Sequence, residues 1–255
     1  MPGSRSRYLE SPPPAELDDL VACHWAQQIA PGDASYPQRV LPDGCVDIVW
    51  QPDQGLAIAG PATTAAIADL PPGAVTLGIR FLPGAAGAAL GVPASELRDD
   101  TVPLADVWGA EADTLTEGVA TAPSPALALA ALADALTQRR AAERAAEADP
   151  LVAAAARELE QPGVRVRELG ATLGVSERQL RRRFDDAVGY GPKTFDRVTR
   201  LRRFLERAER PGEHRSLGVL AAEAGYADQA HLARDCQRLA GLTPTRLLAT
   251  RAPAA

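Results

Sequence analysis

The stretch LGATLGVSERQLRRRFDDAVGYGPKTF, residues 169–195, decides the fold of the C-terminal half of the chain. A short helix is predicted over 166–173, and Gly174 then supplies the left-handed turn that a residue with a Cβ atom resists. Ser176, with Gln179 three residues further on, forms a capping box that starts a second helix. This order of elements predicts a helix-turn-helix.

The second helix has an apolar face and a basic face. At about 100° per residue, Leu180, Phe184 and Ala187 share one face, and the opposite face carries Arg178, Arg181, Arg182 and Asp185. The contact of arginine with guanine O6 and N7 is the commonest specific contact in the major groove, so this face predicts a DNA-reading surface. The alternative is a solvated surface helix with excess positive charge, and the turn, the cap and a second copy of the pattern disfavour it.

The pattern is repeated about fifty residues later. The first three repeated positions lie 51 residues apart and the last four lie 52 apart: Leu169/Leu220, Ala171/Ala222, Gly174/Gly225, Leu180/Leu232, Arg182/Arg234, Gly189/Gly241 and Pro192/Pro244. In the second copy, residues 217–224 form the first helix and Asp228 is the expected N-cap of the second. The chain therefore contains a duplicated helix-turn-helix.

A longer helix, residues 193–209, joins the two copies, with apolar residues at spacings of three and four. Seventeen residues of helix span about 25 Å. This length is compatible with two recognition helices held one turn of DNA apart, roughly 34 Å, and so with one monomer that reaches two successive major grooves.

The charge of the chain is divided between its halves. Residues 150–255 hold 19 Lys and Arg against 13 Asp and Glu, whereas residues 1–149 hold 8 against 20. A basic half behind an acidic half is expected when one part meets a polyanion and the other does not. Nearly all of the basic residues in the C-terminal half are arginine, whose planar fork suits phosphate and guanine edges.

The composition indicates a folded protein in the cytoplasm. Hydrophobic residues at 46% and charged residues at 24% exclude a disordered or collagen-like chain. Three widely spaced cysteines indicate reduced thiols, not a disulfide framework. The longest uncharged run, between Glu117 and Asp134, is too short to cross a bilayer, and the N-terminus has no apolar signal segment, so no membrane contact is expected.

The N-terminal half reads as short strands and helices. Strands are predicted over 45–51, 56–59 and 75–82, because turn residues bound each apolar run, and a short helix is predicted from Ala15 to about Val21. The Ala-rich helix over 126–147 either pairs with its copy in a dimer or packs within its own domain. Asp149-Pro150 is the expected domain boundary, since the residue before proline disfavours helix.

The predicted fold class is α+β, with an N-terminal mixed α/β or small-barrel domain followed by an all-α double helix-turn-helix domain. The expected parts are a flexible tail (1–14), a sensor-like domain with β-strands (15–122), a helical connector (123–149) and a DNA-binding domain (150–255).

Arg80 is the least expected residue of the N-terminal half, because it lies in a strand of otherwise apolar residues. A buried arginine needs an anion, which is either Asp47 of the same domain or the carboxylate or phosphate of a ligand. The candidate ligand-binding residues are therefore Trp25, Asp47, Trp50 and Arg80.

Residues 169–195 and LAAEAGYADQAHLARDCQRLAGLTPTRLL, residues 220–248, together resemble the C-terminal DNA-binding domain of AraC/XylS-type transcription regulators. The resemblance covers roughly 100 residues. It implies that the positions facing bases or the adjoining backbone are Arg178, Arg181 and Arg182 in the first copy and Gln229, Ala230, His231 and Arg234 in the second. Ser176 and Gln179 complete the predicted DNA-binding set. Cys236 departs from the family, which usually has an aromatic residue there.

The N-terminal segments LPDGCVDIVW, IAGPATT, LGIRFLPGAA and VPLADVWG look like an uncharacterised domain that is often attached in front of this kind of DNA-binding domain. By analogy with the wider family, such a domain binds a ligand or dimerises. The expected partners are double-stranded DNA, RNA polymerase, a small-molecule effector and a second copy of the chain, and no cofactor is expected.

The sequence thus predicts a DNA-binding transcription regulator and no enzyme. One alternative is a metal- or thiol-dependent enzyme, or an alkylation or redox sensor, that uses Cys23, His24, Cys45 and Asp47. It is disfavoured because no His-x-His, Glu-x-x-His or Gly-x-Ser-x-Gly motif occurs and because Cys23 and His24 are adjacent. A further alternative is an architectural DNA binder with broad sequence tolerance.

Overall fold

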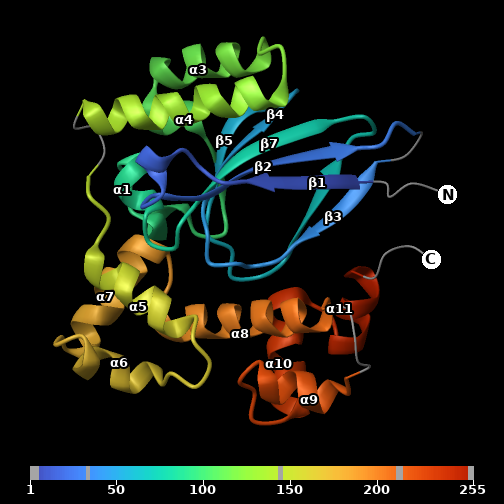
Figure 1. Ribbon diagram of the computed structural model, residues 1–255, viewed down its shortest axis with the longest axis vertical. Coiled ribbons are helices and arrows are strands. Elements are labelled where there is room, and N and C mark those ends of the chain that lie inside the picture. Colours follow the sequence, from blue (N-terminus) through green and yellow to red (C-terminus); the bar gives the residue numbers. More distant parts are fainter. Residues whose placement is uncertain (1–5, 33–34, 143–145, 211–214, 252–255) are drawn as a thin grey trace.

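The computed structural model describes residues 6–32, 35–142, 146–210 and 215–251, which form two domains with separate hydrophobic cores (Figure 1). The first core draws on buried residues from Leu17 to Leu136, and the second on buried residues from Val152 to Leu247. The N-terminal domain is built on a β-sheet and the C-terminal domain is all helical, as the predicted fold class requires.

The main sheet of the N-terminal domain has six strands in the order β1-β2-β7-β4-β5-β8. All of its pairings are antiparallel, and its members are β1 (Ser6–Ser11), β2 (Val21–Ile29), β7 (Val75–Phe81), β4 (Asp47–Gln51), β5 (Gly55–Ala59) and β8 (Thr101–Pro103). A second, two-stranded sheet pairs β3 (Tyr36–Val40) with β6 (Ala66–Leu70). In the described part of the chain, β1 and β8 are the open edges of the main sheet, so the domain is mixed and not a closed barrel.

The three predicted strands are present as β4, β5 and β7. Residues 6–11, however, were expected within a flexible tail, and they form β1, whose register with β2 runs from Ser6↔Ile29 to Ser11↔His24. This edge strand is half-buried at Ser6 and exposed along the rest of its length, so its residues show no apolar alternation from which a strand could be read.

The helix predicted from Ala15 to about Val21 is also wrong. A single 3-10 turn, η1 (Ala15–Leu17), occupies its start, and β2 begins at Val21. Leu17, Leu20 and Val21 have the spacing of three and four that predicts a helix, but a 3-10 turn followed by a strand buries them instead.

The N-terminal domain also contains helices α1 (Ala86–Leu90), α2 (Leu104–Trp108), α3 (Ala110–Ala120) and α4 (Pro125–Ala141), with a 3-10 turn η2 (Ala94–Leu97) between α1 and β8. In Figure 1, α3 and α4 lie together above the main sheet. Leu129, Leu132 and Leu136 of α4 are buried in the first core. Of the two alternatives for this helix, packing within its own domain is therefore the one that the structure shows.

The C-terminal domain contains α5 (Pro150–Leu159), α6 (Val166–Thr172), α7 (Glu177–Val188), α8 (Pro192–Ala208), α9 (Leu217–Glu223), α10 (Gln229–Ala240) and α11 (Pro244–Arg251). In Figure 1, α8 runs between a group formed by α5, α6 and α7 and a group formed by α9, α10 and α11. Helix α8 lies within one residue of the helix predicted over 193–209. No helix in the described ranges is both long enough and apolar enough to cross a membrane.

Candidate nucleic-acid interface

The first helix-turn-helix, α6 and α7, has the geometry that its sequence predicts. Gly174 forms the turn at a φ of 69°, in the left-handed region that favours glycine. The Oγ atom of Ser176 accepts a hydrogen bond from the amide of Gln179 at 3.2 Å, and the side chain of Gln179 accepts one from the amide of Ser176 at 3.1 Å. The predicted capping box is confirmed, and it fixes the start of α7.

Helix α7 buries its apolar face and exposes arginines on the other. Leu180 and Phe184 are buried in the second core, whereas Arg178, Arg181 and Arg182 are exposed. These three side chains form no hydrogen bond or ion pair with the part of the chain that the structure describes. Their guanidinium groups are thus free to bind an external acceptor, as recognition of base edges requires.

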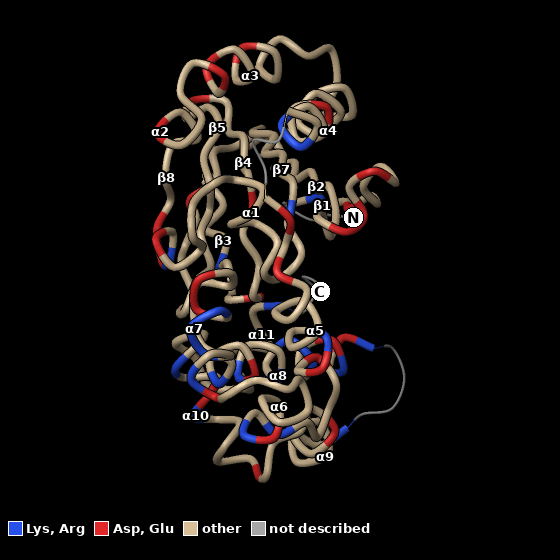
Figure 2. Tube along the Cα trace, turned by 90° about the vertical axis from the view of Figure 1, so that its left-hand side faces the viewer, with Lys and Arg blue, Asp and Glu red and all other residues tan. Residues whose placement is uncertain are grey.

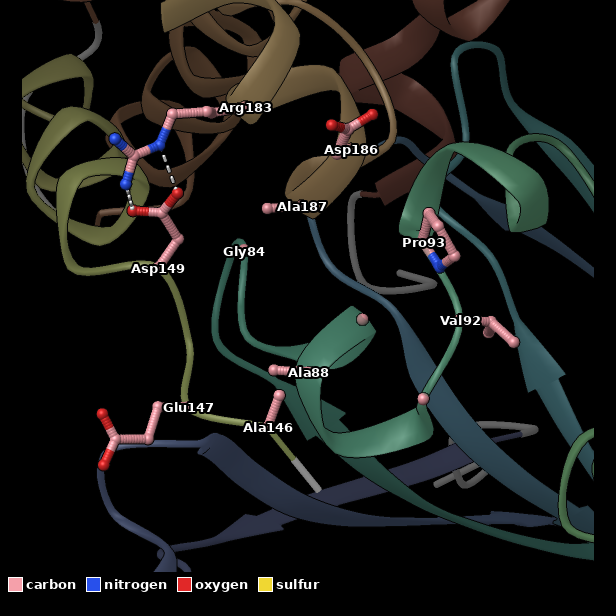
Figure 3. A pocket seen from close by; sticks show the side chains of 12 residues that line it. Gly84, Ala88, Val92, Pro93, Ala146, Glu147, Asp149, Arg183, Asp186 and Ala187 are labelled. Carbon is pink, nitrogen blue, oxygen red and sulfur yellow. Dashed lines mark hydrogen bonds and ion pairs between the residues drawn. The ribbon is translucent and has the colours of Figure 1, made fainter. Parts of the chain in front are cut away.

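The fourth arginine of this run has a different role. Arg183 donates a hydrogen bond from Nε to Oδ2 of Asp149 at 2.6 Å, and a second from Nη2 to Oδ1 (Figure 3). Asp149 also caps α5, because its Oδ1 accepts a hydrogen bond from the amide of Leu151 at 2.9 Å. The segment that enters the DNA-binding domain is therefore fastened to the recognition helix of the first unit.

The pKa of Asp149 reflects these contacts. Burial favours the neutral acid, but the hydrogen bonds from Arg183 and from the amides of Leu151 and Val152 outweigh it and hold the pKa of the carboxyl below its ordinary value. The lowered pKa means that the carboxylate stabilises the folded state at neutral pH.

Replacing Asp149 by Ala is expected to lower the free energy of unfolding by about 0.5–2 kcal/mol, because the N-cap of α5 is lost. Urea unfolding of Asp149→Ala and wild type at pH 7 measures the effect. The difference should shrink as the pH falls through the lowered pKa of Asp149, since the protonated side chain no longer favours folding. Asp149→Asn keeps a capping oxygen and is the matched control, expected to lose less; equal midpoints for Asp149→Ala and wild type would contradict the assignment.

The second helix-turn-helix, α9 and α10, repeats the arrangement of the first. Gly225 forms the turn at a φ of 92°, and Asp228 caps α10 by accepting a hydrogen bond from the amide of His231 at 2.6 Å. Gln229, Ala230 and Arg234 are exposed on α10. Arg234 and Arg238 form no hydrogen bond or ion pair with the described residues, so α10 offers two free arginines where α7 offers three.

His231 is only partly directed to solvent. Its ring packs edge-on against Tyr226 with centroids 5.1 Å apart, and its Nε2 lies 3.8 Å from Oδ2 of the buried Asp235. The same oxygen lies 3.6 Å from Nη2 of Arg200 in α8. The predicted DNA-facing histidine thus also joins the second unit to the connecting helix.

Helix α8 fastens both units through its arginines. Arg202 donates to Oε1 of Glu160, at the end of α5, at 2.8 Å. Arg203 donates to the carbonyl of Ala224, at the end of α9, at 3.2 Å. Figure 2 shows α7 and α10 on the same side of α8, with many Lys and Arg residues along these helices. The two recognition helices are thereby presented to one side of the domain.

The candidate ligand residues of the N-terminal domain form an internal network. Arg80 donates from Nε to Oδ1 of Asp47 at 3.1 Å and from Nη2 to Oδ2 at 3.0 Å, and Trp25 donates from Nε1 to Oδ2 at 3.0 Å. Of the two anions considered for Arg80, the structure provides the internal one. Trp50 is three residues from Asp47 on the same strand and so points to the opposite face of the sheet, where it packs against the first core.

The thiols have the character of structural residues. Burial, with a smaller contribution from Glu10, raises the pKa of Cys23 to about 11, and desolvation raises that of Cys45 well above its ordinary value. A thiol with a raised pKa holds little nucleophilic thiolate at pH 7. In the described ranges, no group of three or more His, Cys, Asp and Glu side chains is arranged to hold a metal ion.

The sequence analysis assigned no role to Arg183 or to the side chain of Asp149, which the structure pairs. A run of arginines in the sequence does not indicate which of them form ion pairs in the folded protein and which remain free. The capping pattern Asp149-Pro150 was the one available signal, since proline favours the first position of a helix and aspartate the position before it.

Two family models match the chain. One, described as a domain of unknown function (DUF6597), matches residues 9–103, and the other, described as a helix-turn-helix domain, matches residues 169–250. Among solved structures, ToxT from Vibrio cholerae O395 is 8% identical with a TM-score of 0.45, over 98% of this chain and 99% of that chain. Unsaturated fatty acid-bound wild-type ToxT from Vibrio cholerae strain SCE256 is 8% identical with a TM-score of 0.40, over 94% of each chain. No curated protein matches the chain.

Two capped recognition helices with free arginines, carried on one helical domain, define a DNA-binding protein with a double helix-turn-helix. The C-terminal domain is a helix-turn-helix domain of the AraC type. The chain is a DNA-binding transcription regulator, with a DUF6597 domain in front of its DNA-binding domain.

Proposed function

We propose that one chain reads two successive major grooves, with α7 in one groove and α10 in the next. The observation that carries the proposal is the pair of capped helices whose exposed arginines have no partner among the described residues, Arg178, Arg181 and Arg182 on α7 and Arg234 and Arg238 on α10. Ser176, Gln179, Gln229, Ala230 and His231 complete the proposed surface. Both helices lie on one side of α8, which supports simultaneous contact with one face of a duplex (Figure 2).

The two units are proposed to contribute unequally. Three free arginines on α7 supply more hydrogen-bond donors for guanine and phosphate than the two of α10, of which Arg238 lies in the last turn of the helix. In addition, His231 is partly engaged with Tyr226. Helix α7 therefore carries more of the direct base readout, and α10 adds fewer base contacts together with positioning.

The N-terminal domain is proposed to sense a small-molecule effector or to dimerise, and the regulator is proposed to act on RNA polymerase in the cytoplasm without enzymatic activity. A cleft of about 610 Å³ supports an effector, because its walls come from both domains: α1 with the adjoining Ala146, and α7 (Figure 3). Within this scheme Arg80 keeps its structural role with Asp47. Of the candidate set, Trp25, Asp47 and Arg80 would reach a ligand only by opening that network, and Trp50 packs against the core on the other face of the sheet.

The two-groove proposal is tested by comparing equivalent arginines. Arg182 and Arg234 occupy the same position in the two units, so each replacement by Ala is expected to cost about 1–3 kcal/mol on the specific site if each makes a bidentate base contact. Arg182→Ala should relax base preference in one half of the site, and Arg234→Ala in the other half, about one helical turn away. Randomised-site selection with each variant measures this directly.

Arg157→Ala is the matched control. Arg157 is also an exposed arginine of the DNA-binding domain, but it lies on α5, which Figure 2 places on the side away from α7 and α10. The control should keep the wild-type sequence preference. Relaxation of the same base pairs by both test variants, or of none, would rule out reading of two grooves; uniform weakening on all sequences would instead indicate phosphate contacts.

A further inference from the structure

The N-terminal domain contacts both recognition helices at their C-terminal ends. Arg98, directly after η2, donates from Nε to the carbonyl of Gly189 and from Nη2 to Oδ1 of Asp185 at 2.9 Å, both at the end of α7. Arg39 of β3 donates from Nη1 to the carbonyl of Ala240, the last residue of α10, at 2.9 Å. The same kind of side chain thus binds the equivalent end of the helix in each unit.

These contacts fit the chemistry of a helix end. The last carbonyls of a helix have no partner within it and carry partial negative charge, which a guanidinium group satisfies and stabilises. The free arginines of α7, by contrast, begin at its second residue, Arg178. The contacts from the N-terminal domain therefore hold each recognition helix at its C-terminal end, and the arginines that are proposed to read DNA stay exposed.

One short segment of the N-terminal domain, residues 60–65, links the two contacts, and we call it the bridge segment. Pro61 packs so closely on Gly189 that a Cβ atom at that glycine would lie 2.2 Å from Cγ of Pro61. Four residues further on, the amide of Ala65 donates to the carbonyl of Leu239 in α10 at 2.7 Å. Four extended residues span at most about 14 Å, so the bridge segment limits how far apart the ends of α7 and α10 can move.

The bridge segment is itself fixed to the segment that carries Arg98. The amide of Gly60 donates to the carbonyl of Asp100 at 2.9 Å, and the amide of Asp99 donates to the carbonyl of Pro61 at 3.2 Å. Thr63 binds the carboxylate of Asp99 through its amide and its hydroxyl, each at 2.6 Å. These hydrogen bonds therefore hold the segment that carries Arg98 against the bridge segment.

We propose that Arg39, Arg98 and the bridge segment are positioning elements that fix the separation and mutual angle of α7 and α10, and so set the spacing between half-sites that the regulator accepts. This inference rests on the proposed reading of two grooves. Partly exposed ion pairs such as Arg98–Asp185 add little to stability. Loss of these contacts is therefore expected to change the geometry of DNA binding and to leave the free energy of unfolding nearly unchanged.

The test measures the affinity of the full chain for duplexes in which the spacer between the two half-sites is one or two base pairs longer or shorter. Each added base pair rotates one half-site by about 34–36° and moves it by about 3.4 Å, which a rigid pair of helices cannot follow. Wild type should discriminate sharply between spacers. In the double variant Arg39→Ala/Arg98→Ala, the preference for the best spacer over its neighbours should fall by about fivefold or more, a typical size for coupling between sites.

Arg140→Ala is the matched control, because Arg140 also forms two short hydrogen bonds, each 2.7 Å, but to Asp19 within the N-terminal domain. It should keep the wild-type spacer profile. Arg39→Lys/Arg98→Lys retains the charges and should restore part of the discrimination. Affinity for a single half-site should be the same in all these variants, which separates a positioning role from a general loss of binding.

The outcomes distinguish the two proposals. A wild-type protein without spacer preference would overturn the reading of two grooves and this inference with it. A clear wild-type preference that the double variant keeps unchanged would overturn the positioning role alone. A double variant that binds all spacers more weakly by the same factor would also overturn it, because the arginines would then support binding without setting the geometry.

Discussion

The affinity of the regulator for its specific duplex is expected to fall by about 10³ to 10⁵ when the salt concentration rises from 50 to 200 mM, as it does for proteins with about 6 to 10 phosphate contacts. The physical reason is the release of condensed counterions by cationic side chains. The helical domain supplies such side chains on its surface. Those that are exposed and whose side chains form neither a hydrogen bond nor an ion pair with the described residues are Arg178, Arg181, Arg182, Lys193, Arg210, Arg234, Arg238 and Arg246.

Fluorescence anisotropy over a series of salt concentrations measures the slope of log affinity against log salt. Removal of one phosphate contact should reduce the slope by about one, whereas removal of a base contact should relax sequence preference. Lys193→Ala is an informative variant, because Lys193 is exposed at the start of α8 and outside both recognition helices. An affinity that does not depend on salt would contradict a DNA-binding role for this surface.

Replacing Phe195 by Ala is expected to destabilise the protein by about 3–5 kcal/mol, the usual cost of deleting a buried phenylalanine. Phe195 is completely buried, and its ring meets Phe184 of α7 edge-on with centroids 5.4 Å apart. Gly44 of the N-terminal domain lies against the same ring, since a Cβ atom at Gly44 would be 2.6 Å from Cε2 of Phe195. The void would therefore open where the recognition helix, the connecting helix and the N-terminal domain meet.

Equilibrium unfolding in urea, followed by circular dichroism, measures this loss. Phe195→Leu is the control, and it should cost less because it leaves a smaller void. If Phe195→Ala cost less than about 0.5 kcal/mol, as a surface substitution does, the ring would not hold these three parts together.

The helix-turn-helix units could be predicted from the sequence because their signals are local. Gly174 and the capping box of Ser176 and Gln179 act within a few residues, and the duplication repeats the pattern. The strands β4, β5 and β7 were found for the same reason, since turn residues bound each of them. Each element is specified by neighbours in the chain.

The strands that were missed depend on partners far away in the sequence. In β2, Gln27 is buried although it is polar, and its amide donates to Oγ of Ser6 at 2.8 Å in the strand that pairs with it. The register of β2 also shifts between Val21 and Cys23, which breaks the alternation of buried and exposed residues. When the hydrogen-bond partner of a buried polar residue lies in a distant strand, the local sequence pattern does not show that the residue is buried.

The same distinction applies to the candidate site. Arg182 and Arg183 are neighbours of identical chemistry, and only the position of Asp149 makes the first free and the second paired. The contacts of Arg39 with Ala240 and of Arg98 with Gly189 join residues about two hundred and about ninety positions apart. Helical spacing predicted which arginines face outward, and tertiary packing decided which of them remain available.

The double role of Asp149 matters for anyone who divides this chain into parts. A fragment that starts at Pro150, where the sequence suggests the boundary, discards the carboxylate that both begins α5 and holds Arg183. The missing pair would release an arginine beside the three that are already free on α7 and add to its positive charge. A truncation that retains residues 146–149 keeps this arginine occupied, so the cut site itself alters the charge that the isolated domain presents to DNA.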